Sequence, residues 1–109
     1  MTIASNQSGS QTATISTEHT LGSAITAAGV YVFVCDCTNM VNGDVLELRI
    51  YTKCKSGSTE RLAYFATYAH AQGDMIKYSV PVPCDTSFKA TLKQTAGTGR
   101  AFEWNLLSL

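Results

Sequence analysis

The chain carries little charge, and the charge it has is unevenly placed. Only 15% of its 109 residues are charged and the formal net charge at pH 7 is zero, whereas ordinary soluble domains have about 25% charged residues. No lysine or arginine precedes Arg49, so the first half offers no cationic site for phosphate. The basic residues of the second half are scattered, which argues against a nucleic-acid-binding surface. A sparsely charged surface favours association with other proteins.

Long hydrophobic runs are also missing. The N-terminus, MTIASNQSGSQ, has neither the basic start nor the apolar stretch of a secretion signal. The longest apolar run, residues 27–35, is far shorter than the ~20 residues of a membrane-spanning helix. We therefore expect synthesis in a cytoplasm, no membrane partner and thiols that begin reduced.

Helical periodicity is nearly absent, and alternation takes its place. Residues 1–14 are rich in Ser, Thr, Gln and Asn, which predicts a flexible polar N-terminal arm, and residues 15–109 are expected to form a single domain. The turn signals NGD, KSGST, AQGD and TAGTG separate the apolar segments. An all-β fold follows: an antiparallel β-sandwich or jelly-roll-like barrel of about seven to eight short strands. The alternation predicts strands at residues 12–17, 30–37, 45–54, 61–69, 75–82, 88–94 and 101–107.

No catalytic constellation is recognisable in the sequence. His19 lies in a polar segment and His70 beside the AQGD turn, and a general base needs an acid or nucleophile within hydrogen-bond reach. The glycines of TAGTGR lack the strand-to-helix context and the lysine of a phosphate loop. We therefore expect no enzyme activity, no cofactor and no metal.

Four cysteines, Cys35, Cys37, Cys54 and Cys84, stand out in a chain without a secretion signal. Cys35 and Cys37 fall within the predicted strand VFVCDC, where residues i and i+2 lie roughly 6.5–7 Å apart. A disulfide needs Cβ atoms near about 3.8 Å. These two cysteines therefore cannot bond to each other while the strand persists.

The dipeptide Asn42-Gly43 between two apolar runs predicts a two-residue hairpin. That register places Asp36 opposite Arg49, and it puts Cys54 about 13 Å from Cys35 along the ladder. Cys84 is then the only cysteine of the same chain that remains as a disulfide partner, and it can bond to only one of the others. The same register places these residues together on one face: Tyr31, Phe33, Cys35, Cys37, Leu46, Leu48 and Ile50.

Several interpretations of the cysteines stay open. Free cysteines are often small buried hydrophobes. A zinc site is a poor match, because structural zinc prefers cysteines two to four residues apart on a turn. A redox role for the CxC pair needs an exposed thiolate of lowered pKa. The remaining interpretation is intermolecular disulfide bonding, for which Cys35, Cys37, Cys54 and Cys84 are all candidates.

Three tyrosines, Tyr64, Tyr68 and Tyr78, form a second candidate feature. They could make an aromatic patch that binds a sugar or a protein, and packing between strands explains them equally well.

The polar N-terminal segment, the all-β body and the segment YSVPVPCDTSFKATLKQTAGTGRAFEWNLLSL (residues 78–109) resemble small virion proteins of tailed bacteriophages, of the head-decoration or capsid-linking type. The resemblance implies a non-enzymatic β-sandwich on the capsid surface of the virion. Its partners would be the major capsid protein or other capsid-decorating proteins, with the chain acting as a homo-oligomer, for example a trimer. Lysis releases phage particles into an oxidising medium, where thiols at interfaces would close into covalent links. The alternative is a receptor- or glycan-binding β-sandwich module of a virion appendage, using the tyrosine patch.

Overall fold

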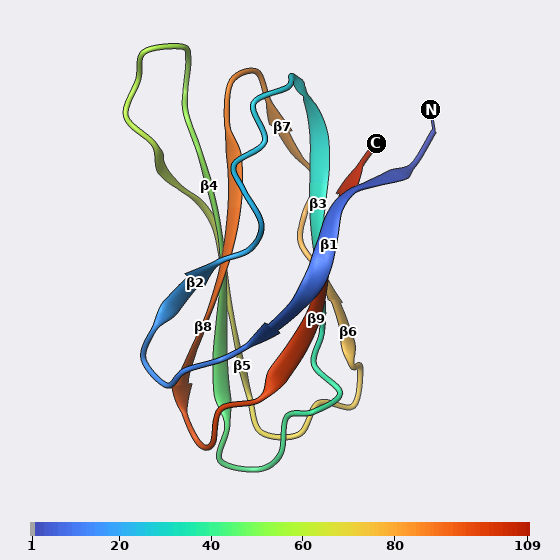
Figure 1. Ribbon diagram of the computed structural model, residues 1–109, viewed down its shortest axis with the longest axis vertical. Helices are drawn as coiled ribbons and strands as arrows, with labels where there is room; N and C mark the ends of the chain where they lie inside the picture. The colour runs from blue at the N-terminus through green and yellow to red at the C-terminus, as the bar shows by residue number, and fades with distance from the viewer. Residues whose placement is uncertain (1) are drawn as a thin grey trace.

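The computed structural model describes residues 2–109 as an all-β molecule of two antiparallel sheets packed face to face (Figure 1). The first sheet has the order β1-β9-β3-β6, with β7 also pairing with β3, and the second has the order β2-β8-β4-β5. The predicted β-sandwich is confirmed. The nine strands are β1 (Ala4–Thr12), β2 (Glu18–Thr20), β3 (Gly29–Asp36), β4 (Val45–Thr52), β5 (Arg61–Ala69), β6 (Ile76–Tyr78), β7 (Val82–Cys84), β8 (Phe88–Ala96) and β9 (Ala101–Ser108).

The core lies between the two sheets and is built by alternation. On β3 the residues Tyr31, Phe33 and Cys35 face inward and are at most 3% exposed. On β4 every second residue, from Leu46 to Ile50, is buried in the same way. Burial of apolar surface at about 25 cal/mol per Å² makes this layer the main source of stability.

The predicted hairpin at Asn42-Gly43 is wrong. β3 pairs with β9, β6 and β7, whereas β4 pairs with β5 and β8, so residues 37–44 cross from one sheet to the other. Asp36 lies opposite Glu103, not Arg49. The seven residues predicted to share a face are all buried together, but they meet across the core from opposite sheets.

The physical reason is that β3 is apolar on both faces. Val32 on its outer side is only 8% exposed, and β3 lies inside its sheet, with β9 on one edge and β6 and β7 on the other. Because β4 lies in the other sheet, its inward residues and those of β3 are buried against each other across the core.

The segment predicted as a flexible arm contains a strand. Residues 4–12 form β1, which pairs with β9 along its whole length and has one register shift between Ser5 and Gln7. Ladder hydrogen bonds come from the backbone, so a polar strand can pair as well as an apolar one. Gly9 permits the close approach of Trp104, because a Cβ there would lie 3.1 Å from Cζ2 of the indole.

Two more of the predicted strands, 12–17 and 75–82, differ from the structure. Residues 13–17 contain no strand, because β1 ends at Thr12 and the chain turns toward β2. The segment 75–82 is divided into β6 and β7. Pro81 lies at this division and has no N–H to donate to a ladder.

Candidate functional site

Two of the four candidate cysteines are inside the core. Cys35 is 0% and Cys37 1% exposed, and both are free thiols. The hydrogen bond between them and their burial raise the pKa of Cys35, while the bond from Cys35 lowers the pKa of Cys37 against the opposing effect of burial. In the folded chain neither sulfur can reach another molecule. The buried-hydrophobe interpretation fits this pair.

Cys54 and Cys84 lie nearer the surface. Cys54 is exposed in the loop between β4 and β5, and Cys84 ends β7 with partial exposure. The Sγ of Cys84 contacts the carbonyl oxygen of Ala27 at 3.9 Å, and burial raises the pKa of this thiol. All four cysteines are free, so Cys84 forms no bond with another cysteine of the chain. Cys54 and Cys84 are the two sulfurs placed for contact with a neighbour.

The three candidate tyrosines do not form one patch. Tyr64 and Tyr68 lie on β5 and pack against the core, whereas Tyr78 lies on β6 of the other sheet and is 63% exposed. The Nζ of Lys77 sits 4.7 Å from the Tyr68 ring centroid. Desolvation by burial raises the pKa of Tyr68 to about 12. Tyr64 and Tyr68 therefore serve packing, and Tyr78 alone is a surface group.

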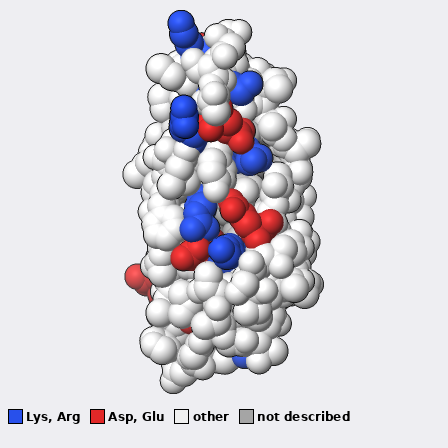
Figure 2. Space-filling view, turned by 90° about the vertical axis from the view of Figure 1, so that its left-hand side faces the viewer, with Lys and Arg blue, Asp and Glu red and all other residues white. Residues whose placement is uncertain are grey.

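The outer face of the four-stranded sheet carries charges that satisfy one another, and Figure 2 shows them gathered along the middle of this face. Glu18 accepts hydrogen bonds from Tyr51 at 2.6 Å and Thr91 at 2.7 Å. Desolvation would raise the pKa of Glu18, but these two bonds and nearby cations hold it below its ordinary value. Arg49 pairs with Glu47 at 2.8 Å. Lys89 of β8 pairs with Glu60 at 3.0 Å.

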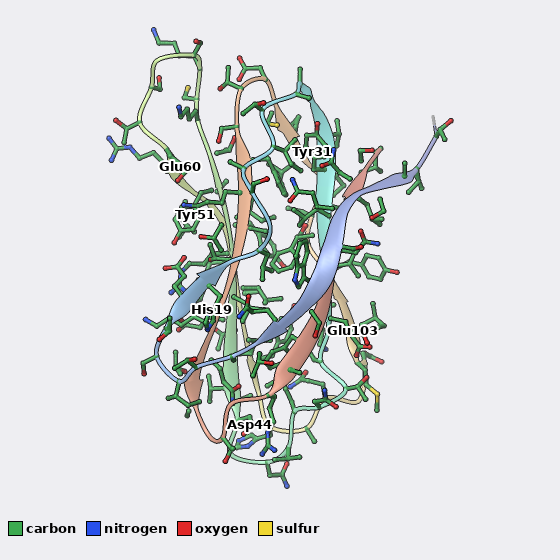
Figure 3. All side chains as sticks on the ribbon, in the orientation of Figure 1. His19, Tyr31, Asp44, Tyr51, Glu60 and Glu103 are labelled. Carbon is green, nitrogen blue, oxygen red and sulfur yellow. The ribbon has the colours of Figure 1, made fainter. Side chains whose placement is uncertain are left out.

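The outer face of the five-stranded sheet is hollowed instead. A groove of about 500 Å³ crosses β9 and β3 between β1 and β6. Asp36 and Glu103 lie directly opposite each other on this face (Figure 3 labels Glu103), and neither forms an ion pair within residues 2–109. Like charges in this position cost stability. The groove is lined by Ser8, Gly9, Ser10, Val34, Asp36, Ile76, Glu103, Trp104 and Asn105.

The free edges of the two sheets differ in length. β6 and β7 at one end of the first sheet and β2 at one end of the second have three residues each. β1 and β5, at the opposite ends, have nine each, and their outer edges have no partner strand among the described residues. Such edges present unpaired N–H and C=O groups to other chains. Sequence reasoning placed β5 but missed its edge position, because strand order depends on pairing between segments far apart in the chain.

Both histidines have structural roles. His19 accepts the Thr14 N–H at its Nε2 (3.0 Å), and His70 accepts the Gly43 N–H at its Nδ1 (2.9 Å). His70 also adopts a positive φ of 68°. Both imidazoles thus fix loops.

Comparison with known protein families, with curated proteins and with solved structures gives no match for this chain. Residues 2–109 hold no group of three or more His, Cys, Asp or Glu side chains placed to bind a metal ion. The same residues include no helix long and apolar enough to cross a membrane.

Proposed function

We propose that this chain is a non-enzymatic structural protein of a phage virion, which decorates or cross-links the capsid. The observation that carries the proposal is the pair of long edge strands, β1 and β5, which contain no proline and no charge apart from Arg61 at the start of β5. Folded proteins usually protect such edges with charge, proline or short length. An edge left open over nine residues is suited to a neighbouring chain.

Exposed apolar side chains support the same role. They occur at the strand edges and loops and not in one enclosed pocket, as expected of a small protein that several neighbours contact. Its partners would be the major capsid protein or other decorating proteins, together with further copies of itself. The exposed large hydrophobic residues are Ile3, Ile15, Val41, Leu62, Phe65, Met75, Ile76, Tyr78 and Val80.

Of the four candidate cysteines, Cys54 and Cys84 are the two that we propose for intermolecular disulfides. Both are free, and both are at least partly exposed. After lysis, dissolved oxygen would take up two electrons and two protons as either thiol and a cysteine thiol of a neighbouring chain form a disulfide. Cys35 and Cys37 are left out because their sulfurs are sealed in the core.

The test uses purified particles of the phage whose genome encodes the chain. On a non-reducing gel we expect bands heavier than the 11.7 kDa monomer, which collapse to the monomer on reduction and disappear in particles carrying Cys54→Ser and Cys84→Ser. A band that stays at the monomer position without reductant would remove the covalent link. Absence of the chain from the particles would remove the proposal itself.

A second candidate function is a glycan-binding module of a virion appendage. The groove on the five-stranded sheet supports it, since its carboxylate, amide and hydroxyl groups match the donors and acceptors of a sugar. Isolated protein applied to a glycan array should then bind specific oligosaccharides, and Glu103→Gln should weaken that binding. An array with no signal from the folded wild-type protein would dispose of this candidate.

A further inference from the structure

The two lateral sides of the sandwich are closed in different ways. On the side of β1 and β2, the chain's own segment 13–28 runs between the sheets, and its Leu21 and Ile25 are buried in the core (Figure 1). Gln7 reaches across from β1, accepting the Ser23 N–H at 2.9 Å and donating to the Ser23 carbonyl at 3.0 Å. That side is covered from within the chain.

The opposite side, formed by β5 and β6, has no such cover from residues 2–109. The two sheets are bridged there by Lys77 over the Tyr68 ring, and Tyr64 and Tyr68 remain only partly buried. β5 is the outermost strand of its sheet. Its outer edge has no partner strand among residues 2–109, although the Gln72 amide donates to the Ala69 carbonyl oxygen at 2.8 Å at the end of the strand.

Over residues 64–69, β5 lacks the usual protection of an edge strand. Residues 62–69 contain no charge, no proline and no glycine. The only register shift between β4 and β5 lies opposite residues 62–64, so residues 64–69 pair regularly and present a straight edge. Leu62 and Phe65 are 50% and 47% exposed beside that edge. A strand of this kind is a template for pairing with another strand.

From these observations we infer that β5 pairs antiparallel with β5 of a second copy of this chain, around a two-fold axis near Phe65. The two four-stranded sheets join into one, and the self-complementary contact closes as a dimer. In an antiparallel arrangement the uncharged residues 62–69 of one copy lie beside the same uncharged residues of the other copy. It brings the exposed aromatic ring of Phe65 near the same ring of the partner subunit, a favourable cross-strand contact.

Charge at the two ends of the strand favours a second copy as the occupant. Arg61 begins β5 and Asp74 lies in the loop that follows it; both are exposed, and neither forms an ion pair within residues 2–109. In the antiparallel dimer the start of one β5 lies beside the end of the other. Arg61 therefore approaches Asp74 of the partner subunit, and the same attraction occurs a second time across the axis.

β1 is the less suitable edge for such pairing. Its side chains are polar, and the side of the sandwich that it borders is already covered by residues 13–28 of the same chain. Pairing of β1 with β5 of another copy would set serines and glutamines beside the apolar residues of β5. It would also be a head-to-tail contact, which closes only as a ring or continues as a filament.

The inference deepens the proposed assembly role by naming one partner, and it is tested on the isolated chain without capsids. Sedimentation equilibrium of the reduced wild-type protein should show a reversible species of twice the 11.7 kDa monomer mass. Reduction does not matter to this dimer, since the contact contains no cysteine. A wild-type protein that stays monomeric, or that forms trimers or filaments, overturns the inference. Either result leaves capsid binding to be judged separately.

A pair of matched variants locates the contact. Thr67→Lys places a charge on the β5 edge opposite Glu47 of the neighbouring strand, and Ser10→Lys does the same on the β1 edge opposite Glu103. Circular dichroism confirms that each variant folds. We expect Thr67→Lys to weaken dimerisation by about tenfold or more while Ser10→Lys leaves it unchanged. Any other pattern between the two folded variants overturns the assignment to β5.

Charge exchange tests the antiparallel orientation and does not depend on Thr67→Lys folding. Arg61→Glu alone and Asp74→Lys alone should each weaken the dimer, because like charges then meet at both ends of the contact. The double variant should recover most of the wild-type affinity, as in a double-mutant cycle between contacting groups. A double variant no tighter than the single variants contradicts the arrangement.

Discussion

Asp44 and Arg100 form an ion pair of 2.9 Å between Oδ2 and Nε, which joins the crossing between β3 and β4 to the turn between β8 and β9. The Asp44 side chain is 1% exposed, and its Oδ2 also accepts the Val41 N–H at 3.0 Å. This pair holds the loop that carries the chain from one sheet to the other. It connects two segments 56 residues apart in sequence.

Asp44→Asn should destabilise the fold by about 2–4 kcal/mol, because it leaves Arg100 without its buried partner. Desolvation would raise the pKa of Asp44, but the bonds from Arg100 and Val41 outweigh it and hold the pKa below its ordinary value. A depressed pKa gives stability that is present above the unfolded-state value of about 3.9 and is lost as pH falls through the folded-state pKa. Urea titrations at neutral and acidic pH measure both effects. An Asp44→Asn protein as acid-sensitive as wild type would contradict this role.

Thiol reactivity should follow burial. In the native protein we expect a thiol reagent to label Cys54 at once and Cys84 more slowly, since Cys84 is partly buried with a raised pKa. Cys35 and Cys37 should react only when the protein unfolds, because their sulfurs are inside the core. Mass spectrometry of labelled peptides over time gives the order. Rapid native labelling of Cys35 or Cys37 would show that the core opens at β3.

Gly99→Ala tests the docking of the N-terminal segment. A Cβ on Gly99 would lie 2.2 Å from the carbonyl oxygen of Ala13, so the backbone must shift, at a cost of about 1–3 kcal/mol. Gly73→Ala is the matched control, because nothing lies within 4 Å of its Cβ position; its effect should stay within about 0.5 kcal/mol. Thermal melts of both variants supply the comparison. Equal stability would mean that residues near Ala13 are not fixed against the β8–β9 turn.

The tyrosines should separate into structural and surface groups. Tyr68→Ala removes a ring that packs on the core and contacts Lys77, with an expected loss of about 2–3 kcal/mol. Tyr78→Ala alters an exposed ring and should change the unfolding free energy by no more than about 0.5 kcal/mol. Chemical denaturation measures both. If the two variants lose the same stability, Tyr78 has packing contacts in solution beyond those described here.

Much of the fold could be predicted from local pattern. Alternation on β4, β5 and β9 gave the strands with nearly their observed bounds, because side-chain burial with a period of two is visible along the chain. The inward set on β3 and β4 was correct for the same reason. The sequence allows Cys35 and Cys37 to be either buried in the core or placed at an interface, because a buried thiol and an interfacial thiol cannot be distinguished by sequence pattern.

Partner choice between strands could not be predicted. Asn42-Gly43 does form a turn, with Gly43 at a φ of 98°, but the turn belongs to a crossing fixed by Asp44 and Arg100, which are far apart in sequence. β1 was missed because its pairing with β9 depends on backbone groups and on Gly9 beneath Trp104, neither of which produces an apolar pattern. The separation of Tyr78 from Tyr68 likewise follows from the division of the strands between two sheets.

Capsid binding is the most direct test of the proposed function. Particles of the encoding phage made without this gene are mixed with purified wild-type chain, and the protein that co-sediments with them is quantified against the major capsid protein. The account predicts saturable binding at a fixed number of copies per capsid subunit, with folded protein and no added cofactor. The account is contradicted if the particles bind none of the folded chain, even when the chain is added at concentrations well above those used in the sedimentation equilibrium experiment.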